Sequence, residues 1–358
     1  MKNAEQVMVY NNFITHKVLR ELTENAFKGS TADTLNIYID MYKMMIDLYE
    51  PQLEIKNTTI ITSTMVNLCA HLRSYFWNHH RVNTNIFLVY SNMSDKYSKT
   101  YYPNYNSGND LKISTNDRIT GLINDNANLL EILCPYLPDI YFVRGIHEPA
   151  AIILDLIFKE EATGNLSPNL VFTRDDIAMQ IPACNPNTTI YLNSKRTGVS
   201  LYSNFTNAIP IYLLKTGRKR LLENQGFVDK ISCMSSQHIG TLIALTNLPS
   251  RNVKSEYDIN KAINILYSAI TRKSIINSYM SNPLDIYNGL FVGEESKLSP
   301  NSFEFRYKAV DLMSIYRNYL YSPQSKDVSY KVNLDDSNTV KAINNEYFKD
   351  NPLDLNRL

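Results

Sequence analysis

The stretch that decides the fold is LNIYID at residues 35–40, a short apolar run that ends on the carboxylate of Asp40. A run of this length, rich in β-branched and aromatic residues, is typical of a buried strand. Similar runs recur further along the chain, at residues 85–90, 140–143, 169–173 and 189–192. Each of them is expected to form a strand.

The segments between these runs have helical periodicity. Apolar residues at helical spacing predict helices over residues 59–76, 122–133 and 149–159, the last with Pro149 in its first turn, where a missing N–H costs nothing. Strands that alternate with helices predict an α/β fold, a mostly parallel sheet with helices on both faces. Ligands of such sheets bind at the carboxyl ends of the strands, where Asp40, Glu148 and Asp175 fall.

The remaining segments have other patterns. Residues 4–28 have the spacing of an amphipathic helix, and residues 91–117 are polar, rich in Tyr and without a clear period, as functional or disordered loops are. After about Lys215 the pattern is helical without strand runs. We therefore expect an N-terminal helical extension (1–33), a sheet domain (34–214), a helical subdomain (215–320) and a C-terminal tail (321–358).

The composition excludes several classes of protein. With 44% hydrophobic residues and a net charge of +1, the chain is too apolar and too neutral for disorder. No apolar run reaches the roughly 18 residues of a membrane-spanning helix, and the N-terminus lacks the pattern of a signal peptide. A cytoplasmic protein without a membrane partner is expected, in the host cytoplasm if the chain is viral. Asn, Lys, Ile and Tyr are frequent, and A+T-rich codons encode these residues. This bias therefore indicates an A+T-rich genome, such as a viral one, more than it indicates a function.

The four cysteines stand far apart, without a CxxC pair and without His at metal-ligand spacing. Neither a zinc site nor a disulfide framework is indicated, and four buried thiols are expected. The near balance of 36 basic and 35 acidic residues by itself does not favour a nucleic-acid partner.

Three carboxylates at strand ends suit a hard divalent cation, because Mg2+ and Mn2+ prefer oxygen ligands. Such a metal can activate water and stabilise the oxyanions of phosphodiester cleavage. Each acid also has a structural interpretation. A strand-end Asp such as Asp40 or Asp175 often caps a helix, and Glu148 can favour the helix that starts at Pro149.

Five segments, in order, resemble motifs of the 5′ nuclease family, the phage and bacterial flap endonucleases and 5′ to 3′ exonucleases with a PIN-like fold. They are IYID at 37–40, the 85–90 run with YYPNY at 101–105, FVRGIHEPAAI at 142–152, VFTRDDIAMQ at 171–180, and ALTNLPSRNV at 244–253 with 259–266 after it. Together they cover roughly residues 34–320.

This resemblance implies a PIN-like domain followed by a helical helix-three-turn-helix subdomain. It also implies the residues of an active site. The metal shell would be Asp40, Glu148 and Asp175, with Asp176 as a spare ligand for Mg2+ or Mn2+, and Lys96 or Lys99 would stabilise the scissile phosphate.

The chain departs from the family at several acids. Ala150 and Ala151 stand where the family has paired Asp, and Ile177 stands where its next motif has a second Asp. Leu248 and Arg251 replace the two acids that hold the second metal. The two-ion clamp on attacking and leaving oxygens would be lost, which predicts a depleted metal site with weak or absent cleavage.

Cations indicate where nucleic acid would bind. The densest basic run contains Lys215, Arg218, Lys219 and Arg220. Such a run can neutralise several phosphates, although the solvated start of a helix would have the same pattern. Arg251 and Lys254 fall in the turn of the helix-three-turn-helix element, where the family holds duplex phosphates.

Two aromatic features have open interpretations. The Tyr rings of residues 90–105 could stack on unpaired bases or pack the loop onto the sheet, and packing is favoured. His79 and His80, beside Trp77, read as a helix end, where cationic His is favourable, in preference to a metal pair.

Three functions follow as hypotheses. The first is binding of DNA or RNA with a 5′ end or a branch, with little or no cleavage, as in a phage pseudoenzyme. The second is an active Mg2+- or Mn2+-dependent 5′ nuclease with a one-metal site. The third is a scaffold that joins viral protein partners in a larger assembly.

Overall fold

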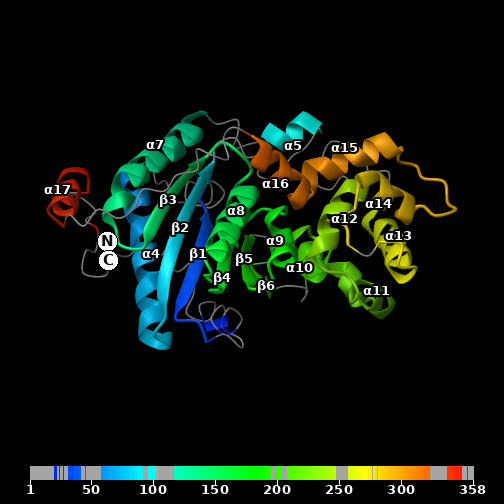
Figure 1. Ribbon diagram of the computed structural model, residues 1–358, viewed down its shortest axis with the longest axis horizontal. Helices are drawn as coiled ribbons and strands as arrows, with labels where there is room; N and C mark the ends of the chain where they lie inside the picture. Colours follow the sequence, from blue (N-terminus) through cyan, green and yellow to red (C-terminus); the bar gives the residue numbers. More distant parts are fainter. Residues whose placement is uncertain are drawn as a thin grey trace.

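The computed structural model describes residues 20–21, 24, 27, 31–41, 45, 58–91, 96–101, 103, 117–194, 198–203, 208–246, 257–275, 277–279, 281–322, 337–348 and 353. A twisted sheet forms one half of the molecule, and a group of helices forms the other half (Figure 1). Most of the helix predicted at residues 4–28, of the loop predicted at 91–117 and of the tail predicted at 321–358 lies outside the described residues, as do residues 247–253 of the motif at 244–253.

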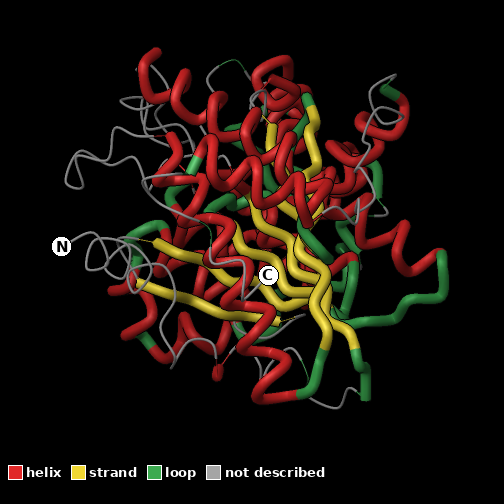
Figure 2. The backbone as a smooth tube through the Cα atoms, turned by 90° about the vertical axis from the view of Figure 1, so that its left-hand side faces the viewer, coloured by secondary structure: helices red, strands yellow, loops and turns green. Residues whose placement is uncertain are grey.

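The sheet has six strands in the order β3-β2-β1-β4-β5-β6 (Figure 2). Five of them are parallel, and β6 pairs with β5 in the antiparallel sense. The strands are β1 (Thr34–Asp40), β2 (Asn83–Ser91), β3 (Ile140–Gly145), β4 (Asn169–Thr173), β5 (Thr188–Ser194) and β6 (Gly198–Ser203). The five predicted strands are confirmed, and β6 is an additional edge strand.

The alternation of side chains along β1 separates two cores. Leu35, Ile37 and Ile39 belong to the core on one face of the sheet, whereas Tyr38 belongs to the core on the other. Successive strand residues point to opposite faces, so Asp40 lies on the face of Tyr38. This face is the one covered by α8 (Pro149–Ala162).

The opposite face is covered by two long helices, α4 (Thr58–His80) and α7 (Asp117–Leu133). Both were predicted over shorter ranges, and α4 ends at His79-His80 as expected. Phe348, which follows α17 (Ser337–Tyr347), is buried in this second core. The C-terminal segment therefore packs against the sheet half of the molecule.

Within its described residues, the chain after Lys215 forms helices and no strand, as predicted. Its α-helices are α11 (Gln225–Ile231), α12 (Ile239–Thr246), α13 (Ile259–Thr271), α14 (Pro283–Leu290), α15 (Pro300–Val310) and α16 (Leu312–Tyr321). The short helices α5 (Lys96–Tyr101), α9 (Ile181–Cys184) and α10 (Ala208–Lys215) and the 3-10 turns η2 (Cys134–Tyr136), η3 (Ala178–Gln180), η4 (Lys219–Glu223) and η5 (Ser236–His238) connect the larger elements.

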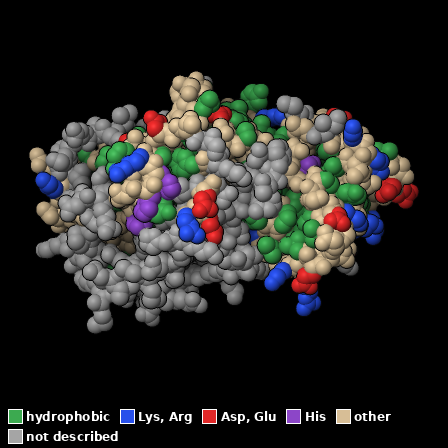
Figure 3. Space-filling view, turned by 90° about the horizontal axis from the view of Figure 1, so that it is seen from below, with side chains coloured by type: hydrophobic (Ala, Val, Ile, Leu, Met, Phe, Trp, Pro, Cys, Tyr) green, Lys and Arg blue, Asp and Glu red, His purple; other side chains and the backbone are tan. Residues whose placement is uncertain are grey.

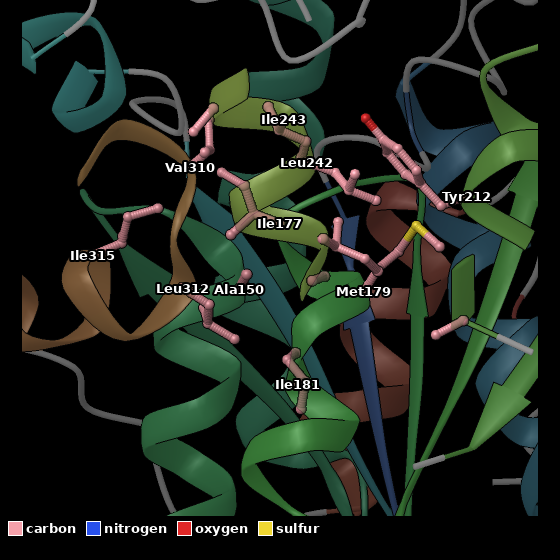
Figure 4. Packing of buried hydrophobic residues seen from close by; sticks show 14 of the residues in the cluster. Ala150, Ile177, Met179, Ile181, Tyr212, Leu242, Ile243, Val310, Leu312 and Ile315 are labelled. Atoms are coloured by element: carbon pink, nitrogen blue, oxygen red, sulfur yellow. The ribbon is translucent and has the colours of Figure 1, made fainter. Parts of the chain in front are cut away.

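One continuous apolar core joins the sheet to these helices. Ala150 of α8 and Ile177 after β4 belong to the same cluster as Leu242 of α12 and Leu312 of α16 (Figure 4). Because removing apolar surface from water is the main favourable term in folding, this shared core holds the helical part against the α8 face.

Gln180 adds polar contacts to the same junction. Its Nε2 donates to the Val310 carbonyl at 2.8 Å, and its Oε1 accepts from the Leu312 N–H at 3.3 Å. A Cβ at Gly240 would stand 2.9 Å from Gln180 Oε1, so glycine lets α12 approach this side chain closely. The side-chain amide of Gln180, which follows β4, thus holds the turn between α15 and α16 in place.

The predicted fold class is confirmed: the molecule is α/β, with a mostly parallel sheet between helices and a helical part after it. Within the described residues, no helix combines the length and the apolar character needed to cross a membrane.

Candidate functional site

Asp40 ends β1 at the carboxyl edge of the sheet, and its side chain is buried on the α8 face, with 1% exposed. Thr173, at the end of the neighbouring strand β4, donates from Oγ1 to Asp40 Oδ2 at 3.2 Å. Burying a carboxylate is costly unless hydrogen bonds compensate for lost water. The Thr173 hydroxyl supplies one such bond.

Asp175 lies two residues beyond β4 and is equally buried. Its N–H donates to Thr173 Oγ1 at 3.0 Å, and its Oδ1 accepts from the Ile177 N–H at 3.2 Å. Thr173 therefore links the two predicted acids through a single hydroxyl. The sequence analysis did not single out Thr173; a hydroxyl residue at a strand end between two predicted acids is the signal that could have found it.

Glu148 is the residue immediately before α8, with 1% of its surface exposed. Its carbonyl accepts from the N–H groups of Ala151 (3.0 Å) and Ile152 (3.2 Å), which starts the helix. A Cβ at Gly145 would overlap the Ile152 side chain, so glycine permits α8 to fold back directly onto β3. This tight turn brings Glu148 to the carboxyl edge on the face of Asp40.

Asp176 pairs with Lys215, the last residue of α10. Lys215 Nζ lies 2.6 Å from Asp176 Oδ1 and also donates to the Arg174 carbonyl. The two side chains are only 15% and 17% exposed. Lys215, predicted to bind nucleic acid, and Asp176, predicted as a spare metal ligand, are thus each other's partners in this structure.

The donor set does not fit a resident divalent metal. Mg2+ and Mn2+ need several oxygen ligands that converge on one point. Within the described residues, no group of three or more His, Cys, Asp and Glu side chains could hold a metal ion. One oxygen of Asp40 and one oxygen of Asp175 accept protein hydrogen bonds.

The positions where the family has further acids are apolar core in this chain. Ala150 and Ala151 are 1% and 0% exposed in the first turn of α8, and Ile177 is 1% exposed. Figure 4 shows Ala150 and Ile177 among the buried side chains between α8 and the helical part. Methyl and butyl groups therefore fill this region, where carboxylates would need counter-charges.

Three of the predicted cations are exposed. Arg218, Lys219 and Arg220 stand at the start of η4, a few residues after the Lys215–Asp176 pair. Figure 3 shows Lys and Arg side chains over the helical half of the lower face, with acidic side chains between them. Arg251 and Lys254 lie outside the described residues.

The other two predicted cations belong to α5, where Lys99 is exposed; the side chain of Lys96 lies outside the described part. The helix is anchored on α15 and α16, because Ser98 Oγ donates to the Ala309 carbonyl at 2.7 Å and Tyr97 to the Ser314 carbonyl at 3.3 Å. The Tyr97 ring packs against Tyr101, with 4.9 Å between centroids. These two Tyr rings therefore pack the segment onto the protein.

Comparison with known proteins gives a distant likeness among solved structures. No family model matches the chain, and no curated protein matches its sequence. Among solved structures, the T5 D15 protein co-crystallised with metal ions is similar with a TM-score of 0.49 and 11% identity, over 79% of this chain and 92% of that chain. This likeness is too distant to carry an argument about function.

Proposed function

We propose that the protein binds nucleic acid with a 5′ end or a branch, as a 5′ nuclease-like protein with a depleted metal site and weak or absent cleavage. The proposal rests on the five motif-like segments of the sequence and on the residues at the carboxyl edge of the sheet. DNA and RNA both fit this chemistry.

The observation that carries the proposal is the apolar packing of Ala150, Ala151 and Ile177. A catalytic metal cluster needs carboxylates at this edge, because the ions must stabilise the attacking and leaving oxygens. In this chain three of those positions contribute to the core. The buried acids Asp40 and Asp175 are part of a hydrogen-bond network with Thr173.

Binding is supported by the exposed cations. The Lys215–Asp176 pair ties the end of α10 to the chain that follows β4, so Arg218, Lys219 and Arg220 emerge close to the carboxyl edge. Exposed cations of one run can neutralise neighbouring phosphates and release their counterions. A polyanion bound there would lie next to the buried acids without requiring a metal.

The test is a binding and cleavage assay with a labelled 5′-flap DNA and the matching RNA. We expect binding that weakens with salt, and a variant with Arg218, Lys219 and Arg220 changed to Ala that binds at least about tenfold more weakly with a shallower salt dependence. Lys219→Glu and Lys297→Glu form a matched pair, since both lysines are exposed but Lys297 lies between α14 and α15. Only Lys219→Glu should weaken binding.

Two outcomes would decide against the proposal. Cleavage with Mg2+ or Mn2+ that disappears in Asp40→Ala would establish the active one-metal nuclease instead. Absence of both cleavage and salt-sensitive binding would leave the scaffold hypothesis.

A further inference from the structure

The C-terminal end of α4 carries an exposed group of aromatic and basic side chains. None of these side chains belongs to the candidate site at the carboxyl edge of the sheet. The group consists of Trp77, His79, His80 and Arg81, and we refer to it as the α4-end cluster. All four residues are exposed, Trp77 to 48%. Trp77 is also the single Trp of the chain.

Arg81 adopts an uncommon backbone conformation. Its φ is 58°, its N–H donates to the Trp77 carbonyl at 3.0 Å, and the next N–H, of Val82, donates to the Phe76 carbonyl at 3.5 Å. Helices often end in this way, but the left-handed residue is usually Gly, because a side chain is strained there. Residues held in such conformations concentrate at functional sites.

The strained backbone at Arg81 places its side chain beside the Trp77 ring. Its guanidinium carbon lies 5.7 Å from the centroid of the Trp77 ring, within cation–π distance. Among the described residues, no carboxylate forms an ion pair with Arg81. The cation is therefore held beside an exposed indole, and no carboxylate of the described part of the chain pairs with it.

The two His rings are held in place as well. His79 Nδ1 donates to the Tyr75 carbonyl at 2.9 Å, and its ring stacks on Tyr75 with 4.3 Å between centroids. The His80 ring stacks on Phe27 with 6.2 Å between centroids. Because Nδ1 of His79 is engaged, Nε2 is the ring atom available to a ligand. Figure 3 shows His side chains gathered on the sheet half of the lower face.

We propose that the α4-end cluster is a second contact for single-stranded nucleic acid, an inference that rests on the proposed function. A base stacks on the exposed Trp77 indole, and Arg81 binds an adjacent phosphate. Stacking on an aromatic ring tolerates every base, and a neighbouring cation supplies phosphate contact, which is how proteins bind single strands without sequence preference. Arg is suited to both tasks, because its planar guanidinium binds phosphate and stacks on rings.

The cluster lies far from the proposed site at the carboxyl edge. Arg81 stands two residues before β2, so the cluster lies at the beginning of that strand, whereas Asp40 ends the neighbouring strand β1. Asp40 pairs with Val89, six residues after Asn83, so the two places are roughly 20 Å apart along the sheet. Variants at one place therefore leave the other intact.

The test uses the full chain with an unlabelled oligothymidylate, read by the fluorescence of Trp77, and with an end-labelled one, read by anisotropy. Anisotropy reports binding anywhere on the protein, whereas the Trp signal reports the α4-end cluster. We expect quenching of Trp77 that follows the rise in anisotropy. Trp77→Ala should weaken binding about fivefold or more, as loss of one stacked base does.

Arg81→Gly separates function from folding. Gly favours the left-handed conformation, so this variant should unfold at the same temperature as the original chain or a higher one, yet lose most of the quenching. Lys273→Gly is the matched control, because Lys273 is also an exposed cation with positive φ, 54°, at the end of a helix. This control should keep the full quenching.

The outcomes distinguish the two proposals. A rise in anisotropy with an unchanged Trp signal would overturn the second contact and leave the proposed function standing. No response in either signal would also overturn the second contact, and no response to the 5′-flap DNA and RNA in addition would overturn both proposals. Equal quenching in Arg81→Gly, or equal quenching by polyglutamate, would also overturn the assignment to nucleic acid.

Discussion

Lys215 Nζ lies 2.6 Å from Asp176 Oδ1, and the same ammonium donates to the Arg174 carbonyl beside the carboxyl edge of β4. Both side chains are mostly buried, so their interaction is only weakly screened by solvent. Lys215→Met should lower the free energy of unfolding by about 2 kcal/mol, because it leaves Asp176 and a carbonyl without their donor. Urea denaturation measures the change.

A double-mutant cycle with Asp176→Asn isolates the pair. If the ion pair stabilises the junction, the two single changes together should cost clearly less than their sum, with a coupling of about 1 kcal/mol or more. Additive losses would mean that Lys215 acts through the Arg174 carbonyl alone.

Thr173 offers a test of the network between the two buried acids. Thr173→Val keeps the shape of the side chain but removes the donor to Asp40 and the acceptor for the Asp175 N–H. The loss should be about 2 kcal/mol, since buried polar atoms lose their partner. Thr173→Ser keeps the hydroxyl and should cost less than half of that in the same denaturation experiment. Equal losses in the two variants would assign the effect to packing.

The pH dependence of stability depends on two buried groups at the junction with the helices. Burial raises the pKa of Asp311, the N-cap of α16, to about 6, and burial lowers the pKa of His238 to about 4. Asp311 therefore contributes stability below about pH 4 that is lost as pH rises to 6. His238 contributes stability above about pH 6.5 that is lost as pH falls to 4.

The two effects oppose each other, so the contributions of Asp311 and His238 should nearly cancel between about pH 4.5 and 6.5. Asp311→Asn can keep the bonds from the Ser314 N–H and hydroxyl, both 2.8 Å at Asp311 Oδ2, but it no longer titrates. Its stability should rise with pH over this window by roughly 2 kcal/mol, which thermal unfolding at stepped pH would detect. A flat profile in the variant would contradict the assignment.

The sheet and its main helices were predictable because their signals are local. Apolar runs give the five parallel strands, and helical spacing gives α4, α7 and α8 within a few residues. The edge strand β6 was missed, because Val199 and Leu201 are its only aliphatic residues and polar residues surround it, which gives no recognisable strand pattern. α5 was missed because its bonds to Ala309 and Ser314 come from residues more than 200 positions away.

The candidate site was predictable only in part, because some of its contacts join residues far apart in the sequence. Asp40 and Asp175 stand at the carboxyl edge because strand direction alone places them there. The density of charge around Lys215 predicted a phosphate contact, but its actual partner, Asp176, is 39 positions away and belongs to another element. Whether Glu148 and the two Asp residues have a catalytic role stays a prediction.

The apolar packing of Ala150 yields the sharpest test of the depleted site. Ala150→Asp puts an acid where the resembled family has one, but in this chain the new carboxylate would stand in the core, with 1% exposure at Ala150. The change should cost about 3 kcal/mol or more, because a buried charge lacks a partner. Ala162→Asp, on an exposed residue of the same helix, should cost less than about 1 kcal/mol.

Added metal tests whether the carboxyl edge retains a metal-binding geometry. A ligand that binds only the folded state stabilises it once its concentration reaches about its dissociation constant. A retained site would therefore let about 10 or more equivalents of Mg2+ or Mn2+ raise the melting temperature of Ala150→Asp towards that of the original chain. We expect no such rescue, because the packing at Ala150 and Ile177 leaves no converging set of oxygens for the ion.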